Sequence, residues 1–469
     1  MLRSIDYQKQ ELFSRLSGDY NPIHTDAIAA RRLIFGRQVV HGIHLLLIAL
    51  ECCCEKFRYR MSIEDLVAIF HAPVGVDEEI DVHIVDEIDG KIKIKINKKK
   101  TICVQIIVKF GEAQAEQYNS YRGGCPPVRA CTDLSAEELN KASGDMELYL
   151  DLEIGKRLFP FLVNSIHETQ LAEILASTRL VGMECPGKNS IFSEFKLNLK
   201  REQDHSSKFG YEVRKFDRRF NLLNITYKGV ISLGKIMAFL RPEYQPQVEF
   251  STLPKHLKHR EFSNQKVLVI GGSRGLGEVT TKILAAGGAD VRFTYFKGYR
   301  DAKVIENEIK QGGGRARCYN FDLKDVNRDL SAIVDCNWFP THFYYFATPF
   351  IFCGTKKVFN SSIYNEFCKY YVHGFNDLID ALNQISRPSI KVFYPSSVAI
   401  DELPEDMGEY VSAKIAGEYL CKILAKTRSN LDIIVHRLPR LATDQTVNLY
   451  GIECQDPIAV LKKIVKNMN

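Results

Sequence analysis

A carboxylate and an imidazole lie five residues apart near the start of the chain. They are Asp19 and His24, in the polar segment SGDYNPIH that Pro22 stiffens. When such groups face one pocket, one can take a proton from water while the other protonates the carbon beside a carbonyl. The spacing therefore predicts addition of water to an activated double bond, or its removal in reverse. The alternative is that Asp19 caps a loop and His24 is a structural histidine.

A glycine just downstream offers a backbone donor to the same chemistry. Gly42 follows His41 at the start of VVHGIHLLLIALECCC, an apolar run of helical length. We expect its N–H group to stabilise the enolate oxygen of a thioester.

A serine, a tyrosine and a lysine near the other end have spacings that suit carbonyl reduction. Tyr410 and Lys414 are four residues apart and share one face of a predicted helix. An ammonium group there is expected to lower the pKa of the phenol from about 10. Ser397 ends a predicted strand thirteen residues before Tyr410. Together they predict a carbonyl that is polarised and protonated while a nicotinamide delivers hydride.

A glycine-rich turn indicates where that cofactor binds. The predicted strand KVLVI runs into GGSRGLG, which opens a helix. Glycine permits a tight turn and lets a pyrophosphate approach backbone N–H groups at the helix N-terminus. The predicted cofactor-binding residues are Gly271, Ser273, Arg274, Gly275, Leu276, Gly277, Lys297, Asp322, Leu323, Ala347, Tyr410 and Lys414.

Charges beyond the turn favour NADPH over NADH. The second strand of this block has no acidic residue at its end to hold a ribose 2′-hydroxyl. Lys297 and Arg300 lie just beyond it, Arg274 lies in the turn, and such cations suit a 2′-phosphate. The alternative is that they are solvated surface charges. Asp322, at the end of the next strand, is expected to bond the adenine ring.

Composition excludes several classes of function. The chain has 63 basic and 57 acidic residues, too even a balance for a typical nucleic-acid binder. The run KIKIKINKKK alternates as a half-buried strand does, although an anionic partner such as a phosphate-bearing carrier is an alternative. No apolar stretch reaches the roughly 18 residues of a membrane span, so we expect a cytoplasmic protein without a membrane partner. The 13 cysteines include no CxxC pair, which predicts reduced thiols and no metal site.

The sequence divides into three blocks, which must position these residues. The first covers residues 1–112, with one helical run followed by strands, and residues 113–145 are a polar linker. The second covers 146–241 and repeats that outline without a D-x-x-x-x-H loop. A further linker covers 242–263. Strand–turn–helix alternation over 264–469 predicts a parallel sheet.

The run from residue 17 to 44 resembles the hydratase motif of MaoC-like hot-dog dehydratases. The matching residues are Asp19, Asn21, Pro22, His24, Asp26, Phe35, Gly36, His41 and Gly42. The resemblance implies that Asp19 and His24 are the catalytic pair and act on 3-hydroxyacyl or 2-enoyl thioesters. ILASTRLVGMECPGKNSIFSEF resembles the helix and strand of a second, degenerate hot-dog domain, which would complete a double hot dog and line the acyl tunnel. His167 and Glu168, before its helix, are expected to be structural.

Residues 264–469 resemble a short-chain dehydrogenase/reductase, because the glycine turn, Ser397, Tyr410 and Lys414 match motifs of that family. The Tyr–Lys spacing resembles its ketoreductases. The chain departs from the family pattern at Ile270 (usually Thr), at 346–348 (FAT in place of N-A-G), at Tyr371 (the place of a relay asparagine) and at Arg440 (usually Gly). These departures put the proton relay and full activity in question.

The predicted fold class is an α+β double hot dog followed by an α/β Rossmann-like, doubly wound parallel sheet. The predicted activity is NADPH-dependent reduction of a 3-oxoacyl thioester and dehydration of the 3-hydroxyacyl product, or the reverse. The alternatives are that only the hot-dog hydratase is active, or that the chain is a non-catalytic acyl-carrier scaffold. The expected partner is an acyl-CoA or acyl carrier protein thioester, and a homodimer is a further expectation. Acyl chain length, carrier and pathway stay open.

Overall fold

The computed structural model describes residues 1–469 except 58–60, 89, 113–119, 201–207, 245, 336, 386–388, 450 and 469. The chain divides into two compact units, one of residues 1–243 and 448–450 and one of residues 244–447 and 451–469. None of the described helices is both long and apolar enough to cross a membrane.

One antiparallel sheet forms the base of the first unit. Its order among the described residues is β1-β3-β4-β5-β2-β9-β12-β11-β10-β7, and its two halves meet where β2 pairs with β9. The strands are β1 (Leu2–Ser4), β2 (Met61–Phe70), β3 (Glu79–Ile88), β4 (Lys91–Lys98), β5 (Thr101–Glu112), β7 (Ser143–Met146), β9 (Ser190–Leu199), β10 (Phe209–Asp217), β11 (Leu222–Lys228) and β12 (Ser232–Leu240). A separate pair joins β6 (Arg122–Gly123) to β8 (Tyr149–Leu150).

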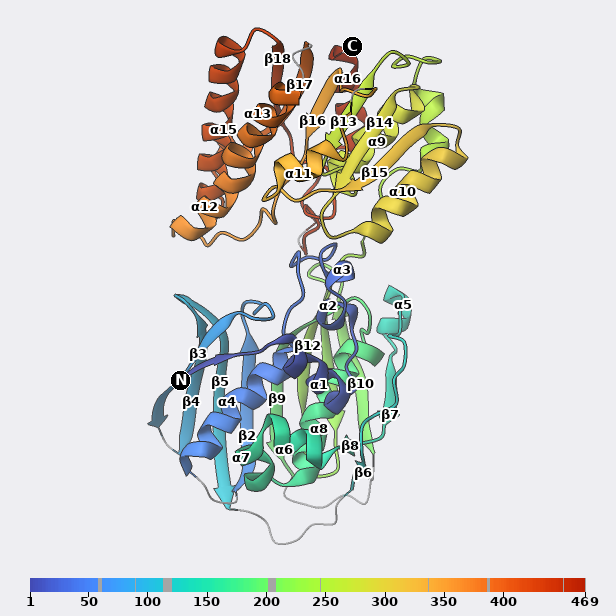
Figure 1. The fold of residues 1–469 in the computed structure, drawn as a ribbon. Helices are drawn as coiled ribbons and strands as arrows, with labels where there is room; N and C mark the ends of the chain where they lie inside the picture. Colours follow the sequence, from blue (N-terminus) through green and yellow to red (C-terminus); the bar gives the residue numbers. More distant parts are fainter. Residues whose placement is uncertain are drawn as a thin grey trace. The chain divides into compact units, whose positions relative to one another are not determined.

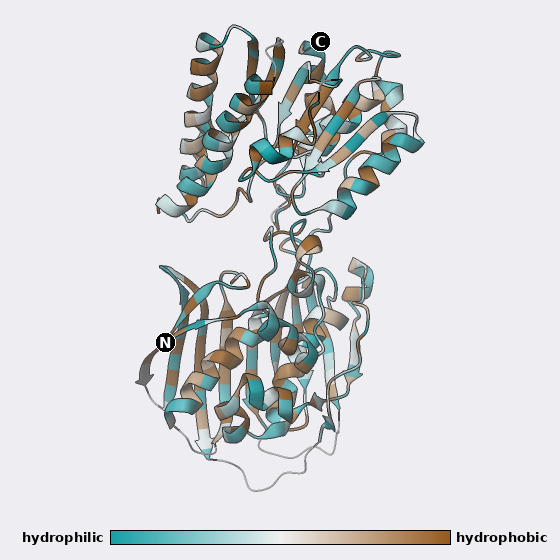
Figure 2. Cartoon of the chain, in the orientation of Figure 1, coloured by the Kyte–Doolittle hydropathy of each residue, from teal (hydrophilic) through white to brown (hydrophobic). Residues whose placement is uncertain are grey.

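The helices of the first unit are α1 (Tyr7–Ser17), α2 (Pro22–Thr25), α3 (Ala27–Ala30), α4 (Gly42–Phe57), α5 (Ala136–Leu139), α6 (Leu152–Leu158), α7 (Pro160–Ser165), α8 (Glu168–Arg179) and the π-helical turn η1 (Leu180–Glu184). In Figure 1 the helices α1, α4, α6, α7 and α8 lie in front of the sheet. The long apolar helix predicted from the first block is α4, and Figure 2 shows hydrophobic residues along it. Residues 169–179 of α8 are all buried, so each half of the sheet has its own central helix.

The alternating lysine–isoleucine run is a half-buried strand, as predicted. In β4 the isoleucines Ile92, Ile94 and Ile96 are buried, whereas Lys91 and Lys93 are exposed. Of the predicted first linker, residues 113–119 lie outside the described residues. Thr132, further along it, donates from its N–H to the carbonyl oxygen of Met183, so this part of the segment packs on the first unit.

A parallel sheet of order β15-β14-β13-β16-β17-β18 forms the second unit, which confirms the predicted parallel sheet. The strands are β13 (Lys266–Ile270), β14 (Asp290–Tyr295), β15 (Arg315–Asn320), β16 (His342–Tyr345), β17 (Ile390–Ser397) and β18 (Leu431–Leu438). The helices are η2 (Phe250–His256), α9 (Gly275–Ala286), α10 (Tyr299–Gln311), α11 (Val326–Ser331), α12 (Ser361–Cys368), η3 (Lys369–Gly374), α13 (Phe375–Ile385), α14 (Ala399–Glu402), α15 (Gly408–Thr427) and α16 (Pro457–Asn467).

Both faces of this sheet are covered. Leu268 and Ile270 of β13 belong to one hydrophobic cluster, which includes residues of α12, α13 and α15. Val267 and Val269 of the same strand belong to another cluster, with residues of α9, α10 and α16. Because successive strand residues point to opposite faces, the sheet is doubly wound. Phe250, from the segment predicted to be the second linker, is part of the latter cluster.

Two candidate active sites

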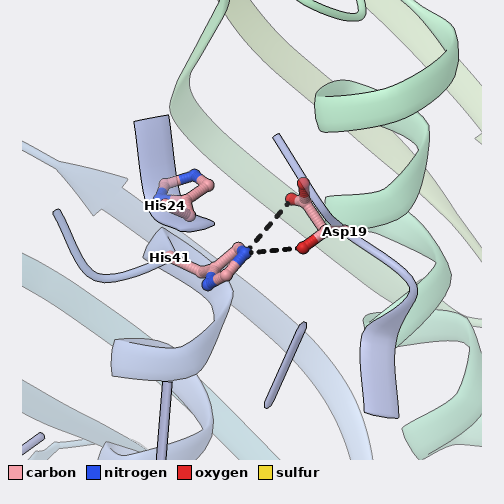
Figure 3. Close-up of side chains that lie close together, drawn as sticks. All are labelled: Asp19, His24 and His41. Carbon is pink, nitrogen blue, oxygen red and sulfur yellow. Dashed lines mark hydrogen bonds and ion pairs between the residues drawn. The ribbon is translucent and has the colours of Figure 1, made fainter. Parts of the chain in front are cut away.

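Asp19, His24 and His41 converge in the first unit, as Figure 3 shows. One ligand-type atom from each lies within 4.8 Å of those of the other two. Asp19 follows Gly18, whose φ of 75° ends α1 in the left-handed region that glycine tolerates. His24 lies on the short helix α2, which Asn21 caps by accepting from the N–H of Ile23.

The carboxylate of Asp19 is buried and held by hydrogen bonds. Its Oδ2 accepts from the hydroxyl of Thr178 at 2.7 Å, and its Oδ1 accepts from the N–H of Asn21 at 3.1 Å. Burial is the largest influence on this group and raises its pKa, against the opposing effects of His24 and Thr178. Asp19 therefore favours the protonated form more than an exposed aspartate does.

The tautomer of His24 follows from its backbone contact. Its Nδ1 lies 2.8 Å from the carbonyl oxygen of Val39, which can only accept, so Nδ1 carries the hydrogen. In the neutral ring Nε2 is then unprotonated and can accept a proton. Burial lowers the pKa of His24, which favours this neutral ring, although Asp19 acts in the opposite direction.

His41 supports both members of the pair. Its ring stacks on that of His24 with centroids 3.9 Å apart, and its Nε2 donates to the backbone oxygen of Asp19 at 3.0 Å. That nitrogen carries a hydrogen and has no lone pair to give a cation. The contacts of His41 therefore hold Asp19 and His24 close together, in an arrangement that suits proton transfer.

Residues that sequence reasoning missed come from the second half of the sheet. Besides Thr178, Gly182 on η1 lies so close to Asp19 that a Cβ there would be 2.2 Å from Oδ1. The side-chain amide of Asn21 donates to the backbone oxygens of Gly182 and Gly187 at 3.0 and 3.2 Å. Nothing in the surrounding sequence, STRLVG, indicates that Thr178 and Gly182 contact Asp19.

Gly42, predicted for this site, and His167 and Glu168, predicted to be structural, have simpler surroundings. Gly42 begins α4, where the first N–H groups of a helix have no partner within it. A Cβ on Gly42 would lie 3.1 Å from the ring of Phe70. His167 caps α8 by accepting from the N–H of Thr169, and Glu168 accepts a hydrogen bond from Tyr121.

Ser397, Tyr410 and Lys414 are brought together in the second unit. Ser397 ends β17 and its hydroxyl hydrogen-bonds with that of Tyr410 on α15. Lys414, one turn further, donates from Nζ to the backbone oxygen of Pro395 at 2.7 Å. Nζ lies 5.9 Å from the centroid of the Tyr410 ring.

The prediction that the pKa of Tyr410 is lowered is wrong for the chain without a bound cofactor. Burial raises the pKa of Tyr410 to about 12, and the hydrogen bond with Ser397 opposes it only in part. Burial also lowers the pKa of Lys414 to about 7. Since desolvation disfavours both charged forms, an ammonium–tyrosinate pair is not the resting state.

The glycine turn between β13 and α9 has the shape that a dinucleotide phosphate needs. Gly271 has a φ of 80°, and a Cβ there would lie 2.9 Å from the backbone nitrogen of Ala347. A Cβ on Gly277, in the first turn of α9, would lie 2.1 Å from the carbonyl oxygen of Gly271. The turn therefore presents bare backbone at a helix N-terminus, which fits a pyrophosphate.

The basic residues predicted near the cofactor differ in their contacts. Lys297 and Arg300 are exposed just after β14, at the carboxyl edge of the sheet. Arg274 instead pairs with Asp444, with Nη1 and Oδ2 2.8 Å apart. The guanidinium of Arg274 is thus directed to the segment after β18, an arrangement that its place in the turn did not indicate.

The other predicted cofactor residues surround the same edge. Oδ1 of Asp322 accepts from the N–H of Lys324 at 3.0 Å. Ser273 is buried, Leu276 packs against the cluster that includes α9, and Leu323 packs against the cluster on the opposite face.

Comparisons with known proteins find a family model and similar proteins. Residues 3–109 match the family model described as a MaoC like domain. The chain is 39% identical over 61 residues, 13% of its length, to the uncharacterized oxidoreductase YgfF of Escherichia coli (strain K12). It spans about a quarter of that relative, 25% of its length.

Solved structures similar to the chain include dehydrogenases and reductases. A dehydrogenase/reductase from Sinorhizobium meliloti 1021 has 19% identity and a TM-score of 0.41, over 45% of this chain and 91% of that one. A short chain dehydrogenase from Burkholderia cenocepacia J2315, solved with NADP, has 20% identity and a TM-score of 0.40, over 45% and 92%. The match of residues 3–109 to a MaoC like domain confirms the resemblance that the motif around Asp19 and His24 carries, and the chain is also similar to an uncharacterized oxidoreductase.

Proposed function

We propose that the chain is a bifunctional acyl-thioester enzyme, which reduces a 3-oxoacyl thioester with NADPH and dehydrates the 3-hydroxyacyl product to a 2-enoyl thioester. Hydration and oxidation are the same steps in reverse. The observation that carries this proposal is the pairing of the buried Asp19 with the partly buried His24, whose tautomer suits proton transfer. The reductive half is supported by the glycine turn and by Ser397 with Tyr410.

In the dehydration step, Nε2 of His24 takes the proton from the carbon beside the thioester carbonyl. Asp19, protonated, gives its proton to the hydroxyl that leaves from the next carbon as water. The step begins with a carboxylic acid and a neutral imidazole, the forms that burial favours. It leaves a carboxylate and an imidazolium, which a proton transfer returns to the starting state. We propose that the N–H of Gly42 stabilises the developing enolate oxygen.

In the reduction step, the hydroxyls of Ser397 and Tyr410 bind the carbonyl oxygen of the substrate, and Tyr410 gives it a proton. Lys414 supplies positive charge near this phenol when protonated. A bound nicotinamide cofactor supplies the hydride. The residues that would hold the cofactor are those of the glycine turn, whose bare backbone faces the N-terminus of α9. Lys297 and Arg300 are exposed at the end of β14, and we propose that they bind the 2′-phosphate of NADPH.

The second half of the first unit is proposed to be a degenerate hot-dog domain that completes a double hot dog. The mirrored order of five strands on each side of the β2–β9 pair supports this, together with the central helix in each half. Thr178 and Gly182 add a role that the sequence did not indicate, which is to shape the pocket of Asp19. We further propose a coenzyme A or acyl carrier protein thioester as the partner, a cytoplasmic location and a homodimer.

A coupled assay tests the proposal. Wild-type protein with acetoacetyl-CoA and NADPH is expected to oxidise NADPH and form the enoyl thioester. Tyr410→Phe should abolish NADPH oxidation but leave hydration of crotonyl-CoA intact. Asp19→Asn should leave NADPH oxidation intact and accumulate the hydroxyacyl product. Failure of both activities with CoA and carrier-protein thioesters of several lengths would contradict the proposal and favour a scaffold.

A hydratase with a silent reductase is the second candidate. The observation that favours it is the burial of Lys414, which lowers the pKa of its amine to about 7. Crotonyl-CoA hydration that depends on Asp19, without any NADPH oxidation, would support this candidate instead.

A further inference from the structure

An aromatic ring covers the ammonium group of Lys414. Nζ lies 3.9 Å from the centroid of the Tyr371 ring, closer than to the rings of Tyr394 at 5.2 Å and Tyr410 at 5.9 Å. Lys414 is 6% exposed. A cation over a ring face is attracted most strongly when water is excluded, so this contact matters more here than on a surface.

Tyr371 is itself fixed from both ends. Its hydroxyl lies 2.5 Å from that of Thr348, and its backbone oxygen accepts from the hydroxyl of Tyr394 at 2.9 Å. Its ring stacks on Phe367, with centroids 5.8 Å apart and planes 8° from parallel. A ring held in this way presents a fixed surface to the lysine.

Local backbone features permit the arrangement. Tyr371 lies in η3, a π-helical turn between α12 and α13, and such turns are frequent at functional sites. Gly417 lies three residues beyond Lys414, and a Cβ there would be 2.0 Å from the Tyr394 hydroxyl and 3.0 Å from the Tyr371 oxygen. Gly417 therefore makes room for the Tyr394–Tyr371 hydrogen bond.

The other titratable groups near Lys414 come from its own helix and from the sheet. Glu418 and Cys421 of α15 raise its pKa, against the dominant effect of burial. The carboxylate of Glu418 is shared with Arg437 at 2.8 Å and with Ser396 at 2.6 Å, and so is not a dedicated partner of the lysine. Tyr394 and Tyr410 present rings at longer distances than Tyr371 does.

We propose that Tyr371 is a positioning residue for the reductase site, whose ring holds the ammonium of Lys414 and favours its charged form. The inference rests on the proposed reductase function for its meaning, but its test does not depend on turnover. The Tyr371 ring thereby sets the charge of Lys414, and the charge of Lys414 sets the proton affinity of Tyr410.

The test measures the pKa of the Lys414 amine in the full chain, by the pH dependence of its acetylation with acetic anhydride followed by peptide mass spectrometry. Tyr371→Leu, which removes the ring, is expected to lower this pKa by about one unit. Tyr371→Phe keeps the ring and should leave it unchanged. The matched control is Tyr370→Leu, which removes the neighbouring ring of the same turn and should also leave it unchanged.

A Lys414 pKa in Tyr371→Leu that is unchanged or higher would overturn the proposal, since the ring would then exclude water rather than hold the cation. The Lys414 pKa can be measured even if the chain reduces no thioester, so failure of the proposed reductase function is distinguishable from failure of this proposal. If the leucine variant does not fold, wild-type protein provides the test. After reductive methylation with ¹³C-formaldehyde, the Lys414 methyl resonance, assigned with Lys414→Arg, should show an upfield ring-current shift, and its absence would equally overturn the proposal.

Discussion

Gly182→Ala should slow the proposed dehydratase step although it replaces neither Asp19 nor His24. An alanine Cβ would lie 2.2 Å from Oδ1 and 2.5 Å from Cγ of Asp19, whereas real Cβ contacts essentially never fall below 3.0 Å. The carboxylate must therefore move by about 0.8 Å, the difference between the two distances. It cannot do so freely, because Thr178 and the N–H of Asn21 hold its two oxygens. A misplacement near 1 Å can cost about 10²-fold in rate, so we expect a loss of that order in kcat.

The assay for this prediction is hydration of crotonyl-CoA, with NADPH oxidation by the same preparation as an internal reference. The matched control is Gly123→Ala, because a Cβ on Gly123 meets nothing within 4 Å and should leave kcat unchanged. Circular dichroism must show that the variant is folded. A folded Gly182→Ala protein with wild-type hydration would refute the reasoning, because the position of Asp19 could not then be critical.

Three further predictions concern hydrogen bonding, pH and cofactor choice. Thr178→Val removes the hydroxyl that donates to Asp19 and should lower hydration kcat by about tenfold, measured beside the wild type. Burial raises the pKa of Glu173 to about 7. The free energy of unfolding is therefore greatest below the usual pKa of a glutamate and falls as the pH rises through 7. Glu173→Gln should remove a pH dependence on the order of 3 kcal/mol in the urea unfolding of the first unit, compared at about pH 5 and about pH 8. Asp444→Asn removes the ion pair of Arg274. It should improve the Kd for NADPH relative to the Kd for NADH by about tenfold, measured by fluorescence titration. Equal changes for both cofactors would contradict a contact between Arg274 and the 2′-phosphate.

Features that depend on neighbouring residues could be predicted from the sequence. The alternation of β4, the glycine turn before α9 and the strand–turn–helix order of the second unit all follow from local periodicity and backbone freedom. The motif around Asp19 and His24 is also local, since a loop and one short helix carry both residues. Such patterns determine which face of an element is buried, and so most of the fold class.

The surroundings of the proposed catalytic groups were decided by tertiary structure. Thr178 lies 159 residues from Asp19, and nothing near either residue indicates that they meet. Burial, which accumulates from every element packed around a group, reversed the expected direction of the Tyr410 pKa. The ion pair of Arg274 with Asp444 and the Tyr371 ring over Lys414 likewise join distant segments. The sequence by itself determined which groups are candidates for the chemistry. Only the packing of strands and helices decided their charge states and partners, because contacts and desolvation depend on the whole fold.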